Sequence, residues 1–372
     1  MKKTASFLSV LLLILLCPVL CHAESAPVWP QMEKTGSVEL LYATEFSVDE
    51  YGAYSLISVT DGRRYLVVPE GVPVPEQLEA DITVLQQPID RVYMVATSAM
   101  DLYRAIGGID RVRFSCLKQS GWYVEEAVQA MEEGRMIFAG KYSAPDYETL
   151  LAEKCGLAVE STMVYHTPEV VETLESLGIH VFIERSSRET HPLGRMEWMK
   201  VHALMLGCLA DAQELFRQEA ERLAPVLEQE STGKTVAFFT VNEDGSVTVR
   251  KSQDYLVKTI ALAGGEYIYE DMDGSSSQTT ATITMESFYA ETRDADILIC
   301  GSTMATELQT RQELLAQCRL LADFPAFQRG DVWSTRYSLF QSTMGLGEFI
   351  LEVNSVLTGQ AEENMQFLYR LH

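Results

Sequence analysis

Two stretches with a helical spacing of apolar residues lie in the middle of the chain, between His191 and Glu230, and meet near Gly207. In the second stretch, apolar residues recur every three or four positions, which is typical of one face of an amphipathic helix. Asp211 comes near its start, where a carboxylate accepts hydrogen bonds from free backbone amides and favours the helix dipole. We therefore predict a long helix whose apolar face consists of Leu209, Ala212, Phe216, Ala220, Leu223 and Leu227.

Short apolar runs alternate with helical patterns on both sides of this stretch. The strands predicted before it are Ile82–Leu85, Val92–Thr97, Met136–Ala139, Leu157–Glu160 and Ile179–Ile183. Those predicted after it are Thr235–Val241, Val247–Arg250, Ile297–Cys300 and Asp331–Ser334. Such alternation is typical of an α/β fold with mostly parallel sheets covered on both faces. The sequence thus predicts two Rossmann-like α/β lobes joined by a long rigid helix, with a cleft between them.

The first lobe begins with a β-rich segment. Its predicted strands are Val38–Ala43, Ala53–Thr60 and Arg63–Val68, and Asp61-Gly62 is a hairpin signal. The Ser/Thr-rich segment 271–284 is predicted to be a loop. The chain then divides into a signal peptide (1–23), a tether (24–37), a first lobe (38–190), connecting helices (191–232) and a second lobe (233–372).

The N-terminus has the pattern of an export signal. Lys2 and Lys3 precede an apolar run, and Cys-His-Ala at 21–23 supplies a small residue for cleavage. The run is shorter than the roughly 20 apolar residues of a membrane span. We expect cleavage after Ala23, with a lipid on Cys21 as the alternative, and a location in the periplasm or on the outer face of the cytoplasmic membrane.

Composition excludes some classes of partner. The chain carries 29 basic and 53 acidic residues, a formal net charge of −24, which argues against binding nucleic acid or anionic lipid through the folded body. Five cysteines lie outside the export signal, without a C-x-x-C pair, so buried thiols and one or two disulfides both stay open. They are Cys116, Cys155, Cys208, Cys300 and Cys318.

Motifs of catalysis and metal binding are absent from the sequence. It contains no P-loop, G-x-G-x-x-G, H-E-x-x-H or G-x-S-x-G, and its six histidines show no metal-ligand spacing. We therefore expect a protein that is not an enzyme, with no catalytic residue, no bound metal of its own and no cofactor. An extracellular enzyme that uses the same cleft is the alternative.

Candidate ligand-binding residues follow the predicted strands, because ligands of α/β sheets bind beyond the carboxyl ends of the strands. Aromatic, hydroxyl and cationic side chains there suit a large polar ligand that carries negative charge. Individual Ser and Thr residues at these places also serve turns and caps, and Trp122 could instead pack on the following helix. The candidates are Trp122, Lys141, Tyr142, Ser143, Thr162, Tyr165, Arg185, Arg188, Tyr255 and Tyr337, with Thr303 and Met304 after a further strand.

Five segments resemble a known family. They are V-Y-M-V-A-T-S-A-M-D-L at 92–102, G-K-Y-S-A-P-D-Y-E at 140–148, E-S-L-G-I at 175–179, E-R-S-S-R-E-T-H-P-L-G-R-M-E-W-M-K at 184–200 and L-A-G-G-E at 262–266. Together they resemble the substrate-binding proteins of ABC importers for iron siderophores, haem and cobalamin, the class III family with a helical backbone. The resemblance covers roughly residues 38 to 360.

The resemblance implies a monomeric two-lobe clamp with a small hinge motion. It implies a metal-chelate ligand (a ferric siderophore, haem or a corrinoid) and an inner-membrane ABC permease dimer with its ATPase as partner. Glu169 and Glu266 resemble the acidic residues, one on each lobe, that dock onto the permease. Arg185, Arg188 and Lys141 would neutralise an anionic chelate, and the tyrosines and Trp122 would pack against its planar parts. A small oxyanion such as molybdate is the alternative ligand.

Overall fold

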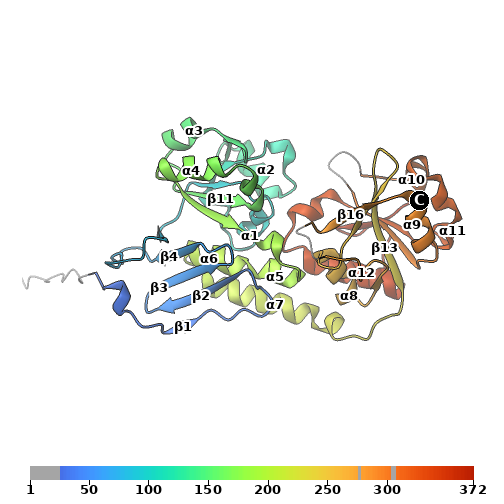
Figure 1. Cartoon of the computed structure of the whole chain (residues 1–372), viewed down its shortest axis with the longest axis horizontal. Helices are drawn as coiled ribbons and strands as arrows, with labels where there is room; N and C mark the ends of the chain where they lie inside the picture. The colour runs from blue at the N-terminus through green and yellow to red at the C-terminus, as the bar shows by residue number, and fades with distance from the viewer. Residues whose placement is uncertain (1–25, 275–277, 303–306) are drawn as a thin grey trace, which may run out of the picture.

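The computed structural model describes residues 26–274, 278–302 and 307–372. Two α/β lobes lie side by side along the long axis, and a separate β-sheet lies below the first lobe (Figure 1). The expected signal peptide, with Ala23 and Cys21, lies outside the described residues, as do Thr303 and Met304. Within the described ranges, no helix has the length and apolar character needed to cross a membrane.

The N-terminal sheet has five strands in the order β1-β2-β3-β4-β5, antiparallel except for the β4–β5 pair. Its strands are β1 (Gly36–Ser37), β2 (Phe46–Tyr51), β3 (Tyr54–Val59), β4 (Arg64–Val68) and β5 (Ile82–Gln86). Residues 26–37, expected to be a tether, instead pack on this sheet: Trp29 is 6% exposed, Val28 forms a bridge with Glu76, and β1 pairs with β2. The tether expectation is corrected accordingly.

The predicted strand Val38–Ala43 does not form. The backbone amides of residues 41–45 are instead bound by two buried carboxylates, one on a connecting helix and one in the segment just before it. Glu197 accepts hydrogen bonds from the amides of Leu41, Tyr42 and Ala43 at 2.8 to 3.1 Å. Glu189 accepts from the amides of the next two residues, 44 and 45, at 2.9 to 3.0 Å. These contacts fix segment 41–45 against the connecting helices.

The first lobe contains an entirely parallel sheet in the order β12-β11-β6-β7-β8. Its strands are β6 (Val92–Met94), β7 (Val112–Ser115), β8 (Ile137–Phe138), β11 (Leu157–Ser161) and β12 (His180–Glu184). The small hairpin β9 (Gly140–Lys141) and β10 (Ala144–Pro145) follows β8. The α-helices of this lobe are α1 (Ala99–Ala105), α2 (Glu125–Glu132), α3 (Tyr147–Ala152) and α4 (Pro168–Ser176). Its 3₁₀ helices are η2 (Ile109–Arg111), η3 (Gln119–Gly121), η4 (Thr162–His166) and η5 (Ser186–Arg188). Another 3₁₀ helix, η1 (Trp29–Gln31), comes before the lobe.

Three helices connect the lobes: α5 (Pro192–Glu197), α6 (Met199–Leu206) and α7 (Leu209–Leu227). Gly207 ends α6 in a left-handed conformation with φ of +80°, which glycine adopts without steric cost. Helix α7 buries Ala212, Phe216 and Leu223, so the predicted long helix and the side of its apolar face are confirmed. It runs below the two lobes (Figure 1).

The second lobe contains a mixed sheet in the order β16-β14-β13-β17-β18-β19, with β15 beside β13. The strands are β13 (Thr235–Val241), β14 (Val247–Arg250), β15 (Glu266–Tyr267), β16 (Thr280–Ile283), β17 (Ile297–Cys300), β18 (Val332–Thr335) and β19 (Leu368–Arg370). Strands β15, β17 and β18 run parallel to β13. The helices are α8 (Tyr255–Leu262), α9 (Met285–Thr292), α10 (Arg311–Gln317), α11 (Pro325–Arg329) and α12 (Leu346–Thr358), with η6 (Arg319–Asp323) and η7 (Tyr337–Gln341). Strand β16 corrects the loop prediction for 271–284.

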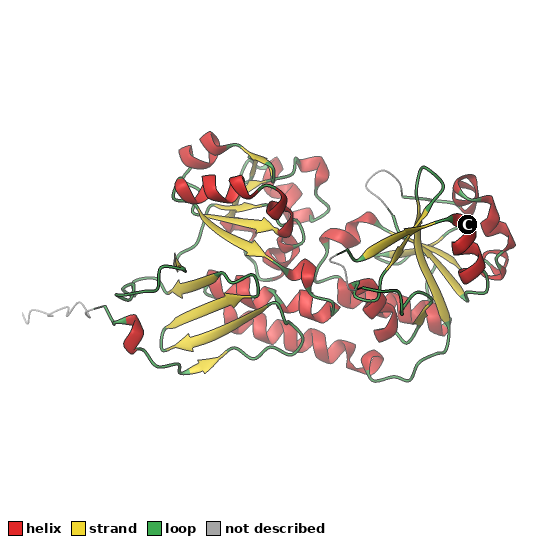
Figure 2. Cartoon of the chain, viewed as in Figure 1, coloured by secondary structure: helices red, strands yellow, loops and turns green. Residues whose placement is uncertain are grey.

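The observed elements confirm the α/β class, with two lobes built around parallel central strands (Figure 2). A continuous apolar core runs through the N-terminal sheet, α1, α6, α7 and the second lobe. A second core fills the space between the first lobe's sheet and helices α3 and α4. A small third core, with Trp29, Tyr54 and Leu66, covers the outer face of the N-terminal sheet.

Candidate functional site

The carboxyl edges of the two central sheets face each other at the junction between the lobes. Ser98 lies after β6 and Gly121 after β7, while Gln341 and Thr343 follow β18. The Thr343 hydroxyl donates to the carbonyl of Ser98 at 2.9 Å. The side chain of Gln341 contacts the loop after β7, because its amide donates to the carbonyl of Gly121 at 2.8 Å and its oxygen accepts from the amide of Tyr123 at 2.9 Å. Ligands of α/β proteins bind at such edges.

A contact between the connecting helices and the second lobe involves an arginine and a tyrosine. The guanidinium carbon of Arg195, on α5, lies 3.7 Å from the centre of the Tyr255 ring, at the start of α8. Arg195 also donates to the carbonyls of Glu189 and Ser187 at 3.0 and 2.8 Å. Tyr255 is 9% exposed. The structure therefore revises the expectation for Tyr255, which packs between the lobes and offers little surface to a ligand.

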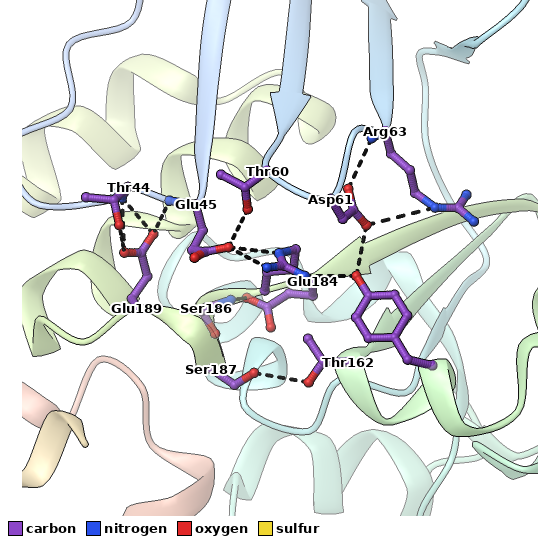
Figure 3. A network of polar contacts seen from close by, with 12 residues as sticks. Thr44, Glu45, Thr60, Asp61, Arg63, Thr162, Glu184, Ser186, Ser187 and Glu189 are labelled. Carbon is purple, nitrogen blue, oxygen red and sulfur yellow. Dashed lines mark hydrogen bonds and ion pairs between the residues drawn. The ribbon is translucent and has the colours of Figure 1, made fainter. Parts of the chain in front are cut away.

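A polar network occupies the ends of β11 and β12 (Figure 3). The guanidinium of Arg185 donates to one carboxylate oxygen of Glu45 at 2.9 and 2.7 Å and to the hydroxyl of Tyr165 at 3.0 Å. The Tyr165 hydroxyl in turn donates to Asp61 at 2.9 Å. Glu45 also accepts a hydrogen bond from Thr60.

This network joins two parts of the fold, because Glu45 and Asp61 belong to the N-terminal sheet whereas Arg185 and Tyr165 belong to the first lobe. The charge of Arg185 is balanced inside the protein by Glu45. The role of Arg185 in neutralising a ligand stays a prediction. Sequence analysis gave no sign of its partner, since Glu45 lies 140 positions away along the chain.

Two buried carboxyl groups lie just below this edge. Burial raises the pKa of Glu160, on β11, to about 8, and neither of its oxygens has a hydrogen-bond partner among the described residues. Burial also raises the pKa of Glu184, on β12, to about 7, although the backbone amide of Ser186 donates to it at 3.0 Å. Because Glu184 is in register with Ser161, the neighbour of Glu160, the two carboxyl groups point to opposite faces of the sheet.

Comparison with known proteins identifies the family. A model of the family described as periplasmic binding protein matches residues 115–338, which is more than half of the 372-residue chain. The chain belongs to the periplasmic binding protein family. An uncharacterized lipoprotein of Methanocaldococcus jannaschii is 24% identical over 265 residues. That match covers 68% of this chain and 63% of the lipoprotein, so the chain spans less than two thirds of that relative.

Solved structures show that this fold is shared. A periplasmic binding protein from Veillonella parvula has a TM-score of 0.59 at 16% identity, covering 74% of this chain and 93% of its own. A periplasmic haem-binding protein from Pseudomonas aeruginosa has a TM-score of 0.57 at 17% identity, covering 76% and 98%. The periplasmic vitamin B12-binding protein of Vibrio cholerae has a TM-score of 0.53 at 16% identity, covering 73% and 98%.

In this periplasmic binding protein, the other predicted ligand residues fall into two groups. Lys141, Ser143 and Arg188 are exposed on the loops at the carboxyl edge of the first lobe, and Thr162 is half-buried with its hydroxyl 3.5 Å from that of Ser187. Tyr142 is half-buried against the core of the first lobe. Nothing in the structure tests whether these side chains contact a ligand, so they stay predictions.

The prediction for Trp122 is corrected. Its side chain is 5% exposed, and its indole N–H donates to the Ser115 hydroxyl at 2.8 Å, so it belongs to the core. The adjacent Tyr123 is 47% exposed, and its ring centre lies 5.4 Å from that of Tyr337 on the second lobe. Tyr337 thus takes part in an aromatic contact between the lobes.

The two predicted docking glutamates are both exposed, one on each lobe of this periplasmic binding protein. Glu169 lies in the first turn of α4, beyond the carboxyl end of β11. Glu266 begins β15 and is in register with Thr235, the first residue of β13. They therefore lie at opposite ends of the strands in their respective sheets.

Proposed function

We propose that this periplasmic binding protein captures a metal chelate between its two lobes and delivers it to an ABC permease in the cytoplasmic membrane. The observation that carries the proposal is the arrangement of the two sheets, whose carboxyl edges meet at the junction between the lobes. Lobes joined by the packed helices α5, α6 and α7 enclose a ligand with little loss of ordering entropy, because the walls are already formed.

The similar structures support the choice of ligand class. Those from Vibrio cholerae and Pseudomonas aeruginosa are named for vitamin B12 and haem, and one from Saccharomonospora viridis for Fe³⁺-hydroxamate transport. We therefore propose a ferric siderophore, haem or a corrinoid as the ligand. Lys141 and Arg188 supply exposed positive charge for its acidic groups, and Tyr142 and Tyr337 supply aromatic surface.

We further propose an exported, monomeric, non-catalytic protein that docks on a permease dimer through Glu169 and Glu266. The family and the lipoprotein relative support a location outside the cytoplasm. The exposure of both glutamates supports the docking role.

Retention of a coloured chelate tests the proposed function. Purified protein is mixed in turn with a ferric siderophore, haem and cobalamin, desalted, and scanned for absorption. We expect about one equivalent of one chelate to stay bound. Loss of all three on desalting would contradict the proposal and favour a colourless oxyanion. Turnover of a chelate into a spectrally distinct product would instead favour an enzyme.

A further inference from the structure

The hydroxyl of Tyr165 is held by hydrogen bonds, whereas its side chain is exposed to solvent. Its hydroxyl has two hydrogen-bond partners inside the protein, Asp61 and Arg185. The side chain is nevertheless 42% exposed, and the ring belongs to none of the three apolar cores. Tyrosines at protein surfaces commonly do the reverse, burying the ring and turning the hydroxyl to water. Tyr165 therefore presents an aromatic surface whose polar end is already bonded.

The partners of the hydroxyl fix the direction of this ring. Asp61 comes from the turn between β3 and β4, and Arg185 comes from the end of β12, where Glu45 holds it on the other side. Burial raises the pKa of Tyr165, so the phenol keeps the proton that it donates to Asp61. Because the ring is held before anything binds, a ligand that stacks on it costs little side-chain entropy.

A second exposed apolar side chain lies on the same turn as Tyr165. Met163 belongs to η4 and is 47% exposed. A methionine thioether packs well against aromatic rings. The hydroxyls of Thr162 and Ser187 lie 3.5 Å apart beside it. This turn follows β11, so the surface lies at the same carboxyl edge that faces the second lobe.

We propose that Tyr165 and Met163 form a stacking surface for a chelate with a flat, conjugated face, and that Asp61 and Arg185 are positioning residues for Tyr165. The inference rests on the proposed function and deepens it, because it selects a planar macrocyclic chelate over an open-chain one. Arg185, expected from the sequence to bind the ligand's negative charge, instead orients the aromatic ring that contacts the ligand.

Affinity measurements on a small set of variants test this proposal. The probes are haem, which is planar and conjugated, and ferrioxamine, a ferric trihydroxamate without aromatic surface. We expect the wild-type protein to bind haem in preference. Tyr165→Leu should weaken haem binding about ten-fold, the range of an aromatic contact. Tyr165→Phe and Asp61→Asn keep the aromatic ring but remove or weaken the hydrogen bonds that hold it in place. Both should weaken haem binding about three-fold and broaden the haem absorption band.

A matched control distinguishes the loss of Tyr165 positioning from a general loss of protein stability. Arg64→Gln removes an ion pair with Asp81, 2.7 Å long, next to the same turn but outside the network. It should change neither affinity nor absorption. Unchanged haem affinity in Tyr165→Leu would overturn the stacking surface while leaving the proposed function intact. Preference for ferrioxamine in the wild-type protein would overturn the planar ligand class. Failure to bind any chelate, cobalamin included, would overturn the proposed function and this inference with it.

Discussion

Arg195 lies over the ring of Tyr255, where the connecting helices meet the second lobe, with 3.7 Å between the guanidinium carbon and the ring centre. The arginine is held from behind by two backbone carbonyls, those of Glu189 and Ser187. The pair lies where α5 meets α8, next to the helices that connect the lobes. The pair therefore ties α5, one of the connecting helices, to the first helix of the second lobe.

Replacement of this arginine by lysine should destabilise the protein. Arg195→Lys loses a desolvated cation–π contact and the two hydrogen bonds that the guanidinium donates to backbone carbonyls. We expect a loss of about 2 kcal/mol in the free energy of unfolding. Arg293→Lys is the matched control, because Arg293 is exposed and lies 5.8 Å from the Tyr289 ring. It should cost less than about 0.5 kcal/mol. Urea unfolding measures both, and equal effects would contradict the special role of Arg195.

Stability should depend on pH through Glu160. Burial raises the pKa of its carboxyl from 4.5 to about 8. Because the folded state holds this proton more tightly than the unfolded chain does, the contribution is fully present below pH 4.5 and is lost as the pH rises to about 8. Glu160→Gln, which cannot titrate, should reduce the fall in unfolding free energy over this interval by up to about 1.4 kcal/mol per pH unit.

Urea unfolding at pH 5 and pH 8 checks the Glu160 prediction. Glu228→Gln, at an exposed position after α7, is the control and should leave the pH dependence as in the wild-type protein. A Glu160→Gln variant with the wild-type slope would show that Glu160 does not titrate in this range.

The carboxylate of Glu197 should be essential for attaching the N-terminal segment. It is fully buried, accepts from three successive amides and pairs with Lys200 at 2.6 Å. Glu197→Gln leaves a buried lysine without its counter-charge, which typically costs about 3–5 kcal/mol. Hydrogen exchange of the amides of residues 41–43 should accelerate most in this variant. Protection equal to that in the wild-type protein would contradict the attachment.

Docking on the permease can be separated from ligand capture. Glu169→Ala and Glu266→Ala should retain a coloured chelate as the wild-type protein does and lower its uptake by membranes carrying the permease, because interfacial charges set encounter rates. Glu172→Ala and Glu270→Ala change exposed glutamates close to each site and serve as controls. Uptake at the wild-type rate in the first pair would exclude these two glutamates from docking.

Local sequence predicted the elements that bury one continuous apolar face. The bounds of β13, β14 and β17 agree with the prediction residue by residue, because their apolar residues follow a clear pattern. Strand β16, in contrast, lies at the edge of its sheet with no buried side chain, and so gives no such signal. Segment 38–43 looks like a strand by composition, but the distant carboxylate of Glu197 binds the amides of residues 41–43.

The candidate site was harder to predict for the same reason. Adjacent aromatics such as Trp122 and Tyr123 are equivalent in a local pattern, yet one is in the core and the other faces the second lobe. The role of Arg185 depends on Glu45 and Tyr165, which only the folded chain brings together. Sequence therefore located the loops of the site, whereas the assignment of individual side chains required tertiary contacts.

The attachment of segment 41–45 by Glu189 and Glu197 also dictates an order of events during biosynthesis. The contacts join residues 144 to 156 positions apart, so their closure waits until the chain is complete to about residue 200. A chain delivered amino end first would carry the inner face of its first sheet uncovered until the connecting helices arrive. An early part of this protein therefore completes its contacts only after residues 189 and 197 have followed it, although it does so before the second lobe is made.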